Sequence, residues 1–161
     1  MNAEMKTTLK ALAFVIAIAA ILVLAKNSIG EKLGISTPLV VVEGYSMLPT
    51  LYNGDIVIVY KPSPYDIKVG DILVYHSLRG ELVIHRVIKI NSGPGCKPLC
   101  YVTKGDNNPV DDVALMLQPH LGISYDEVVG IVYQIDLDIN GKNIVAPFRI
   151  PYLGLLSFIA R

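Results

Sequence analysis

A serine, a histidine and a cluster of aspartates could together carry out nucleophilic chemistry in this 161-residue chain. Ser46 follows the apolar run at residues 40–42 and the turn residue Gly44, and it precedes Pro49. Glycine permits a tight turn, and proline fixes its own φ and disfavours helix at the residue before it. We therefore expect Ser46 just past a strand end on a stiff backbone, where it could act as a nucleophile. A simple β-turn serine is the alternative for this position.

A serine hydroxyl needs a base near neutral pH, because it holds its proton too tightly to attack unaided. The candidate bases are three histidines and two lysines: His76, His85, His120, Lys89 and Lys104. His85 lies inside the apolar run at residues 82–88, where a buried histidine with a purely structural role is the usual explanation. His76 and His120 stand near turn or loop signals, and we expect both to be exposed to solvent.

Three carboxylates, Asp106, Asp111 and Asp112, lie in a short segment that also holds Gly105 and Pro109. The segment lacks the D-x-[DN]-x-[DN]-G spacing and the closing glutamate of a calcium loop, so it does not predict a metal site. A solvated acidic turn is one explanation. In a catalytic triad, one such carboxylate would orient the imidazole and stabilise its charged form.

The composition is apolar for a soluble domain, with 52% hydrophobic and 17% charged residues. The 14 basic and 14 acidic residues cancel without forming a basic stripe, which argues against a nucleic-acid partner. The apolar run at residues 11–25 would give a helix of about 22 Å, or about 28 Å when extended back to residue 7. We predict a single membrane span here, with a slight preference for a cytoplasmic N-terminus. A cleaved signal peptide ending at Ala25 and a buried core helix are the alternatives.

Beyond the predicted span, the sequence favours short strands. Runs rich in Val, Ile and Tyr predict strands at residues 39–42, 56–60, 72–75, 82–90, 101–103 and 128–135. The inner runs do not alternate between apolar and polar residues, which predicts burial on both faces or a coiled sheet. Arg79-Gly80 predicts a hairpin turn, and Ser124-x-x-Glu127 has the form of a capping box. The chain is therefore predicted to be mainly β, with a membrane anchor at 1–26, a linker at 27–38 and a β-rich catalytic domain at 39–161.

Two features leave alternatives open. Cys96 and Cys100 are the only cysteines; zinc would need two further ligands, and a small disulfide is about as plausible as free thiols. The apolar run at residues 151–160 is too short to span a bilayer, so it either packs on the β core or touches the membrane surface. We expect no metal and no cofactor.

Five motifs occur in order between about residues 40 and 132: G-Y-S-M-L-P, G-D-I-L-V-Y, I-H-R-V-I, T-K-G-D-N-N-P-V-D-D and E-V-V-G-I-V. In their order and spacing they resemble the type I signal peptidase family, and the short N-terminal anchor fits that family too. The first motif alone would not be specific, whereas the ordered set is. The resemblance implies a coiled β-sheet catalytic domain of the signal-peptidase type, carried by one N-terminal transmembrane helix.

The histidine selects a branch of this family. Bacterial members and the related SOS-repressor autoproteases carry lysine as the general base where this chain has His85. The archaeal and endoplasmic-reticulum branch carries histidine there, together with the G-D-N-N-x-x-D-D segment. The resemblance thus implies a Ser-His-Asp mechanism with Ser46 as the nucleophile and His85 as the general base, then acid. Asp112 would be the carboxylate that orients the histidine. Asp106 is the second candidate for this role and could instead be needed for loop geometry or activity. Asp111 is the third candidate.

One position departs from the family pattern. Many members of the histidine branch have a serine two residues before the nucleophile, and its hydroxyl can help to bind the oxyanion. This chain has Gly44 there. An oxyanion hole built from the Ser46 amide and neighbouring backbone donors remains available.

The resemblance implies a membrane-anchored serine endopeptidase that removes N-terminal signal peptides from secretory preproteins. Its partners would be those signal peptides, the lipid bilayer and the protein-translocation machinery. Its catalytic domain would lie on the extracytoplasmic side of the plasma membrane or, in a eukaryote, of the endoplasmic reticulum. Met47 and Leu48 would form an apolar rim that dips into the membrane interface. The alternatives are an endopeptidase with another membrane-protein substrate, and a membrane-tethered, non-enzymatic β domain that binds a peptide or a partner protein.

Overall fold

The computed structural model describes residues 16–18, 38–139 and 142–155. The predicted anchor at 1–26 and linker at 27–38 therefore lie almost entirely outside the described residues, as does the second half of the apolar run at 151–160. Within the described ranges, no helix combines the length and the hydropathy needed to cross a bilayer.

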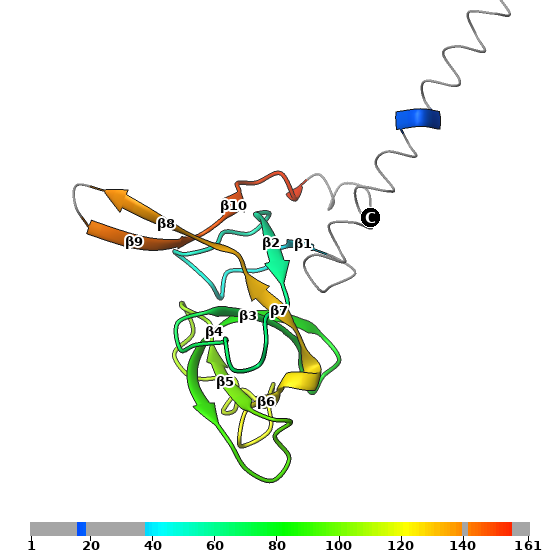
Figure 1. Ribbon diagram of the computed structural model, residues 1–161, viewed down its shortest axis with the longest axis vertical. Helices are drawn as coiled ribbons and strands as arrows, with labels where there is room; N and C mark the ends of the chain where they lie inside the picture. Colours follow the sequence, from blue (N-terminus) through cyan, green and yellow to red (C-terminus); the bar gives the residue numbers. More distant parts are fainter. Residues whose placement is uncertain (1–15, 19–37, 140–141, 156–161) are drawn as a thin grey trace, which may run out of the picture.

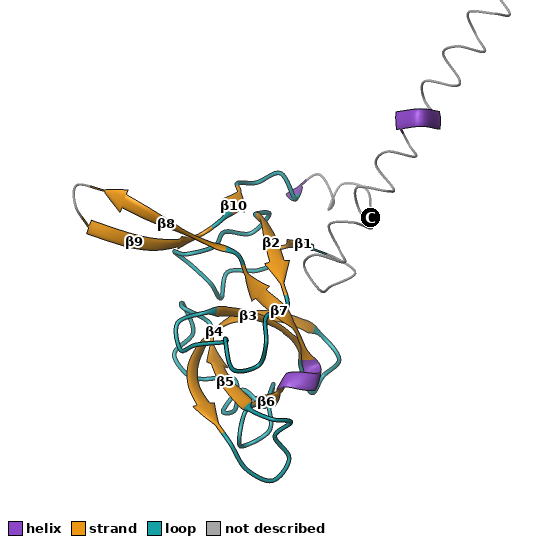
Figure 2. Ribbon diagram, in the orientation of Figure 1, coloured by secondary structure: helices purple, strands orange, loops and turns teal. Residues whose placement is uncertain are grey.

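The described part of the chain is built on antiparallel strands (Figures 1 and 2). One sheet runs in the order β1-β2-β7-β3-β4-β5-β6, and β10 also pairs with β2. Its strands are β1 (Leu39–Val41), β2 (Ile56–Tyr60), β3 (Ile72–His76), β4 (Leu82–Asn91), β5 (Cys100–Lys104), β6 (Ile123–Ser124), β7 (Val128–Val132) and β10 (Arg149–Ile150). The strands β8 (Gln134–Ile139) and β9 (Lys142–Pro147) form a separate hairpin that projects away from the main sheet (Figure 1).

The central strand β3 separates two hydrophobic cores. Its residues Ile72 and Val74 pack on one side with Met47 and Leu51, from the segment that follows β1. Leu73 and Tyr75 point to the other side. Because both faces of β3 are covered, its sequence is apolar at successive positions, as the lack of alternation predicted.

Most predicted strands are confirmed to within two residues, with one correction. The run at residues 128–135 is not a single strand, because pairing breaks at Tyr133. The Tyr133 amide donates to the Ile58 carbonyl, and the Tyr133 carbonyl accepts from Phe148, so the chain leaves the main sheet here. Strand β7 consequently pairs with β2 and β3, while the following residues pair with β9.

The predicted turns divide into one success and one error. The Arg79-Gly80 turn joins β3 to β4 as expected, with Gly80 at φ 76°. The capping box at Ser124 is wrong, although a short 3-10 helix, Tyr125–Glu127, does follow. The Ser124 hydroxyl makes no cap; it accepts from the Lys97 amide at 3.1 Å instead. Because the Ser124 hydroxyl binds the loop around Lys97, it does not cap the 3-10 helix.

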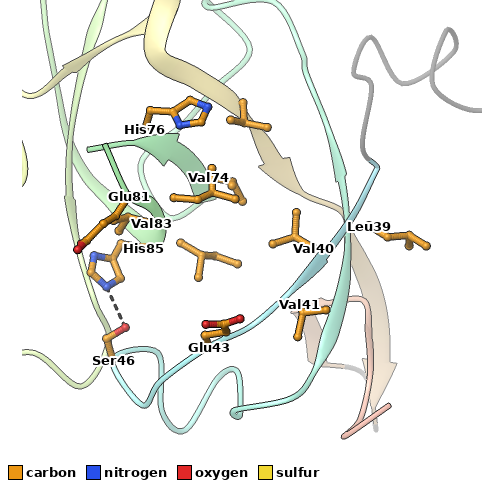
Figure 3. A pocket seen from close by; sticks show the side chains of 13 residues that line it. Leu39, Val40, Val41, Glu43, Ser46, Val74, His76, Glu81, Val83 and His85 are labelled. Carbon is orange, nitrogen blue, oxygen red and sulfur yellow. Dashed lines mark hydrogen bonds between the residues drawn. The ribbon is translucent and has the colours of Figure 1, made fainter. Parts of the chain in front are cut away.

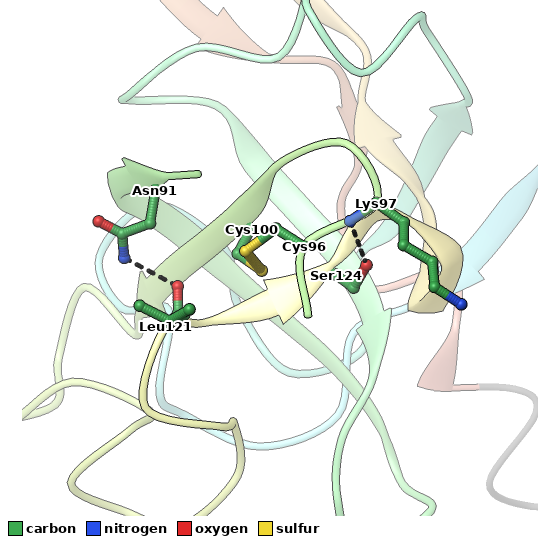
Figure 4. The surroundings of a disulfide bond; sticks show 6 residues. All are labelled: Asn91, Cys96, Lys97, Cys100, Leu121 and Ser124. Atoms are coloured by element: carbon green, nitrogen blue, oxygen red, sulfur yellow. Dashed lines mark hydrogen bonds between the residues drawn. A yellow bond between two sulfur atoms is a disulfide. The ribbon is translucent and has the colours of Figure 1, made fainter. Parts of the chain in front are cut away.

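The loop between β4 and β5 is closed by a disulfide between Cys96 and Cys100, which decides between the two alternatives for the cysteines (Figure 4). At one end of the loop, the Asn91 side chain donates to the Leu121 carbonyl at 2.8 Å. The loop is thereby fastened to the segment around β6.

Candidate active site

Ser46 lies in the loop that connects β1 to β2. The base of this loop is closed by hydrogen bonds from the Val42 amide to the Asp55 carbonyl and from the Gly54 amide to the Val42 carbonyl, both 2.8 Å. Gly44 makes the turn at φ 89°, and its amide donates to the Asn53 side chain at 2.9 Å. Ser46 is thus held on a short, tied segment past a strand end, as the glycine and proline around it predicted.

The segment is also anchored from inside, which overturns the membrane-rim expectation for Met47 but not for Leu48, which is half-buried. Met47 is only 1% exposed and packs in the core beside Leu51 and Val42. It therefore cannot belong to an apolar rim that dips into a membrane. The side chain next to the candidate nucleophile fixes the loop instead, because apolar burial of a methionine stabilises its position by about 1.5–3 kcal/mol.

His85 faces Ser46 from β4. Its Nε2 lies 2.9 Å from the Ser46 Oγ (Figure 3). The residue is 5% exposed, and its strand pairs with β3, where Leu73 is its direct partner. Pairing with the buried strand β3 thus sets the position of the imidazole. His76 and His120 are exposed, as predicted.

Asp112 stands behind the imidazole, with its Oδ2 at 2.7 Å from His85 Nδ1 and its side chain fully buried. The Asp112 amide donates to the Thr103 carbonyl at 2.9 Å, which turns this residue inward from its loop. An ionised carboxylate only accepts, so Nδ1 carries the imidazole proton and Nε2 is left to accept from the Ser46 hydroxyl. The three side chains therefore form one hydrogen-bonded row in the order of a Ser-His-Asp triad.

Asp106 does not join this row. Its carboxylate binds the Arg86 guanidinium through two hydrogen bonds of 2.8 and 2.6 Å, and the Thr50 hydroxyl donates to it at 2.6 Å. Partial burial raises the pKa of the Asp106 carboxyl, but the hydrogen bonds from Arg86 and Thr50 and the charge of Arg86 outweigh it, so the net pKa is lowered. The pair links β4, beside His85, to the loop after β5, and the Thr50 hydroxyl ties both to the loop that carries Ser46. Asp111 caps a turn by accepting from the Ala114 amide at 2.8 Å.

The segment around Asn107 supports the nucleophile loop directly. The Asn107 amide donates to the Ser46 carbonyl at 2.8 Å, and its side chain donates to the Tyr45 carbonyl at 3.2 Å. At Gly105 a Cβ atom would come within 2.7 Å of the Ser46 carbonyl oxygen. Glycine is needed here because the two backbones approach so closely.

Ser46 and His85 line a cleft of about 1010 Å³ that runs between β1 and the first half of β4 (Figure 3). Its apolar lining includes Val40, Val74, Ile84 and Val129, and Glu43 and Glu81 also line it. Both flanking strands present backbone edges. In the described part of the chain β1 pairs only with β2, and residues 82–85 pair only with β3, since pairing with β5 starts at Arg86.

Three buried residues next to the row were not predicted as site residues. Tyr75 and Thr103 contact the Asp112 carboxylate, and Gln118 contacts Thr103. Thr103 opens the T-K-G-D segment and could have been noticed there. Tyr75 reads as an ordinary strand residue and Gln118 as a loop residue, so no sequence signal singles them out.

Comparisons with known proteins match a peptidase family model and several signal peptidase catalytic subunits. The family described as Peptidase S24-like matches residues 20–98. The signal peptidase complex catalytic subunit SEC11 of Schizophyllum commune is 33% identical, over 77% of this chain and 72% of that protein. The SEC11 subunit of Leptosphaeria maculans is 40% identical over 50% of this chain and 46% of that protein. The SEC11C subunit of Canis lupus familiaris is 30% identical over 78% and 58%, respectively. The chain thus spans about half to three quarters of the length of these relatives.

Proposed function

This chain belongs to the signal peptidase family of serine endopeptidases, and on that premise we propose that it cleaves N-terminal signal peptides from secretory preproteins. The observation that carries the proposal is the row of hydrogen bonds from Ser46 through His85 to Asp112 on the wall of an open cleft. A buried acid behind an imidazole, with a hydroxyl in front of it, suits acyl transfer.

The proposed reaction begins when His85 Nε2 takes the Ser46 proton as Oγ attacks the scissile carbonyl. The tetrahedral intermediate collapses as the leaving amine receives that proton from Nε2, which leaves an acyl-enzyme on Ser46. Water then attacks the ester with the same base, and the peptide and the free serine are released. Asp112 stays ionised throughout and stabilises the imidazolium. The Ser46 amide and neighbouring backbone amides would bind the oxyanion, since Gly44 offers no hydroxyl.

The substrate would bind as an extended strand between the two open edges of the cleft. Main-chain hydrogen bonds to β1 and to residues 82–85 would supply affinity without reading the sequence. Alternate side chains of an extended peptide point the same way, so those at positions −1 and −3 would both face the apolar wall. Val40, Val74 and Ile84 line this wall, and we expect their branched side chains to leave room only for small residues at both positions.

We further propose the membrane arrangement that the sequence predicts. Residues 1–26 would anchor the chain, 27–38 would link, and 39–161 would form the coiled β-sheet catalytic domain on the extracytoplasmic side. A disulfide between Cys96 and Cys100 suits an oxidising compartment and supports this side of the membrane. Relatives named as subunits of a signal peptidase complex make partner subunits and the translocation machinery natural candidates for association.

The test is cleavage of a labelled preprotein by the full-length chain in detergent, beside its Ser46→Ala variant. We expect the variant to lose roughly four to six orders of magnitude in turnover, as loss of a triad member does. Ser63→Ala, at an exposed turn serine outside the cleft, is the matched control and should keep full activity. Cleavage by Ser46→Ala close to the wild-type rate would overturn the proposed mechanism, and no cleavage by the wild-type chain would favour a non-enzymatic binding domain.

A further inference from the structure

A group of buried polar side chains surrounds the Asp112 carboxylate on the side away from Ser46. Three donors converge on one oxygen, Oδ2: His85 Nδ1 at 2.7 Å, the Tyr75 hydroxyl at 3.0 Å and the Thr103 hydroxyl. Tyr75, Thr103 and Asp112 are all fully buried. The other oxygen, Oδ1, accepts from none of the described residues. The hydrogen bonding is therefore concentrated on the oxygen that faces the imidazole.

The direction of these bonds follows from one backbone amide. The Thr103 amide can only donate, and it donates to the Gln118 side chain at 3.2 Å, so the Gln118 oxygen must face it. The Gln118 NH₂ group then faces the Thr103 hydroxyl, to which it donates at 2.9 Å. A hydroxyl has one proton, and with Gln118 as its donor the Thr103 proton is left for Asp112.

Tyr75 supplies the second hydroxyl from β3. Burial is the largest cause that raises the pKa of this phenol, and the neighbouring Asp112 charge raises it further. The phenol therefore keeps its proton and donates to Asp112 over the whole working pH range. Donors aimed at an ionised carboxylate stabilise its charge and fix its rotamer.

We propose that Thr103, Gln118 and Tyr75 are positioning residues for the peptidase reaction, acting through Asp112 to hold its Oδ2 as the acceptor of the His85 Nδ1 proton. The inference rests on the proposed function. None of the three residues lines the cleft, so they influence the imidazole and not the bound peptide. Their loss should lower kcat and leave KM unchanged, because the imidazolium that forms in the transition state is less well stabilised.

The central test is Thr103→Val beside Thr103→Ser in the full-length chain in detergent. Valine keeps the shape but removes the hydroxyl, and we expect kcat to fall about 10- to 100-fold with KM within about twofold. Serine restores the hydroxyl and should recover kcat to within about threefold of wild type. Equal kcat in wild type and Thr103→Val would overturn the proposal.

Two further variants keep the test decisive if valine prevents folding, which thermal unfolding would reveal. Gln118→Glu replaces the donor to Thr103 by an acceptor, so the single Thr103 proton has two competing acceptors, and kcat should fall. Tyr75→Phe removes one donor, and kcat should fall by about 5- to 50-fold. Tyr101→Phe is the matched control, because this equally buried tyrosine donates its hydroxyl to the Pro64 carbonyl away from the row, and its kcat should not change. Folded Gln118→Glu and Tyr75→Phe proteins with wild-type kcat would also overturn the proposal.

A readout independent of turnover separates this inference from the proposed function. Proton NMR of the His85 Nδ1–H in the Ser46→Ala background should give a downfield signal that Thr103→Val shifts or broadens and Tyr101→Phe leaves in place. If Ser46→Ala alone retained cleavage, the proposed function would fail whatever the NMR result. If Ser46→Ala were inactive while Thr103→Val left both kcat and the signal unchanged, only the positioning role would fail.

Discussion

Two aspartates in one short loop lie in different surroundings. Asp112 is fully buried against His85, whereas Asp106 is partly exposed and pairs with Arg86. The sequence favoured Asp112 only through a resemblance, because both residues sit among similar turn formers. Tertiary contacts distinguish the two residues. The Asp112 amide donates to the Thr103 carbonyl, which turns Asp112 inward. Asp106 instead accepts hydrogen bonds from Thr50 and Arg86, which come from other parts of the chain.

The ion pair of Asp106 should be visible in the pH dependence of stability. The folded pKa of Asp106 lies below its ordinary value of 3.8, so the pair stabilises the fold above that pH and is lost as pH falls through the folded value. Asp106→Asn leaves the Arg86 guanidinium without its carboxylate, and we expect the melting temperature at pH 7 to drop by about 5 °C.

The difference between wild type and Asp106→Asn should shrink as the pH is lowered from 4 towards 2, where the wild-type carboxyl also becomes neutral. Thermal unfolding followed by circular dichroism measures this, and Asp111→Asn serves as the control because its carboxylate only caps a turn. A melting difference that stays constant from pH 7 to pH 2 would contradict a contribution from the charge.

At the scale of elements, the sequence predicted most strands, because runs of β-branched residues between turn residues are a reliable sign of strands in a buried sheet. It missed the hairpin of β8 and β9, although Gln134–Ile139 alternates polar and apolar residues and Asn140-Gly141 follows it in the sequence. The apolar residues of β7 run almost directly into β8, so the two strands were predicted as one run at 128–135. The short strands β6 and β10 carry no signal of their own, since tertiary pairing alone defines them.

The loop before Asn107 tolerates only glycine at its closest approach. In Gly105→Ala the new methyl group would meet the Ser46 carbonyl, push the two segments apart and break the Asn107 hydrogen bond. We expect kcat/KM to fall about 100-fold, because small displacements of a catalytic group have effects of that size. The protein should still unfold cooperatively, as thermal denaturation would show.

Gly95→Ala provides the comparison for that variant. Gly95 lies in the disulfide loop at φ 97° with open space around a Cβ, so alanine there adds backbone strain without touching Ser46. It should lower stability and leave kcat/KM unchanged. Comparable activity losses in the two alanine variants would show that Gly105 matters for folding alone.

At the scale of the whole molecule, the site combines segments that are distant in the sequence. Ser46 comes from the loop after β1, His85 from β4 and Asp112 from the loop after β5. The ordered motifs identified these three positions because a resemblance carries them. The supporting residues Tyr75 and Gln118 depend on how β3 and a long loop pack around one carboxylate, which no local pattern encodes.

The proposed anchor leads to a prediction for the intact chain. Expressed in cells, it should stay in the membrane fraction after alkaline extraction, and its mass should include residues 1–26. A lysine in the middle of the apolar run, Ile18→Lys, costs about 2.5–3.5 kcal/mol on insertion and should release much of the protein. A mature chain that begins at Lys26 would instead identify a cleaved signal peptide.

The arrangement of the row also bears on the life of the newly made chain. The hydroxyl, the imidazole and the carboxylate meet only after β3, β4 and β5 have paired, because each supplies a member of the row or a donor to it. A nascent copy therefore has an ordinary, unreactive serine until its sheet has closed.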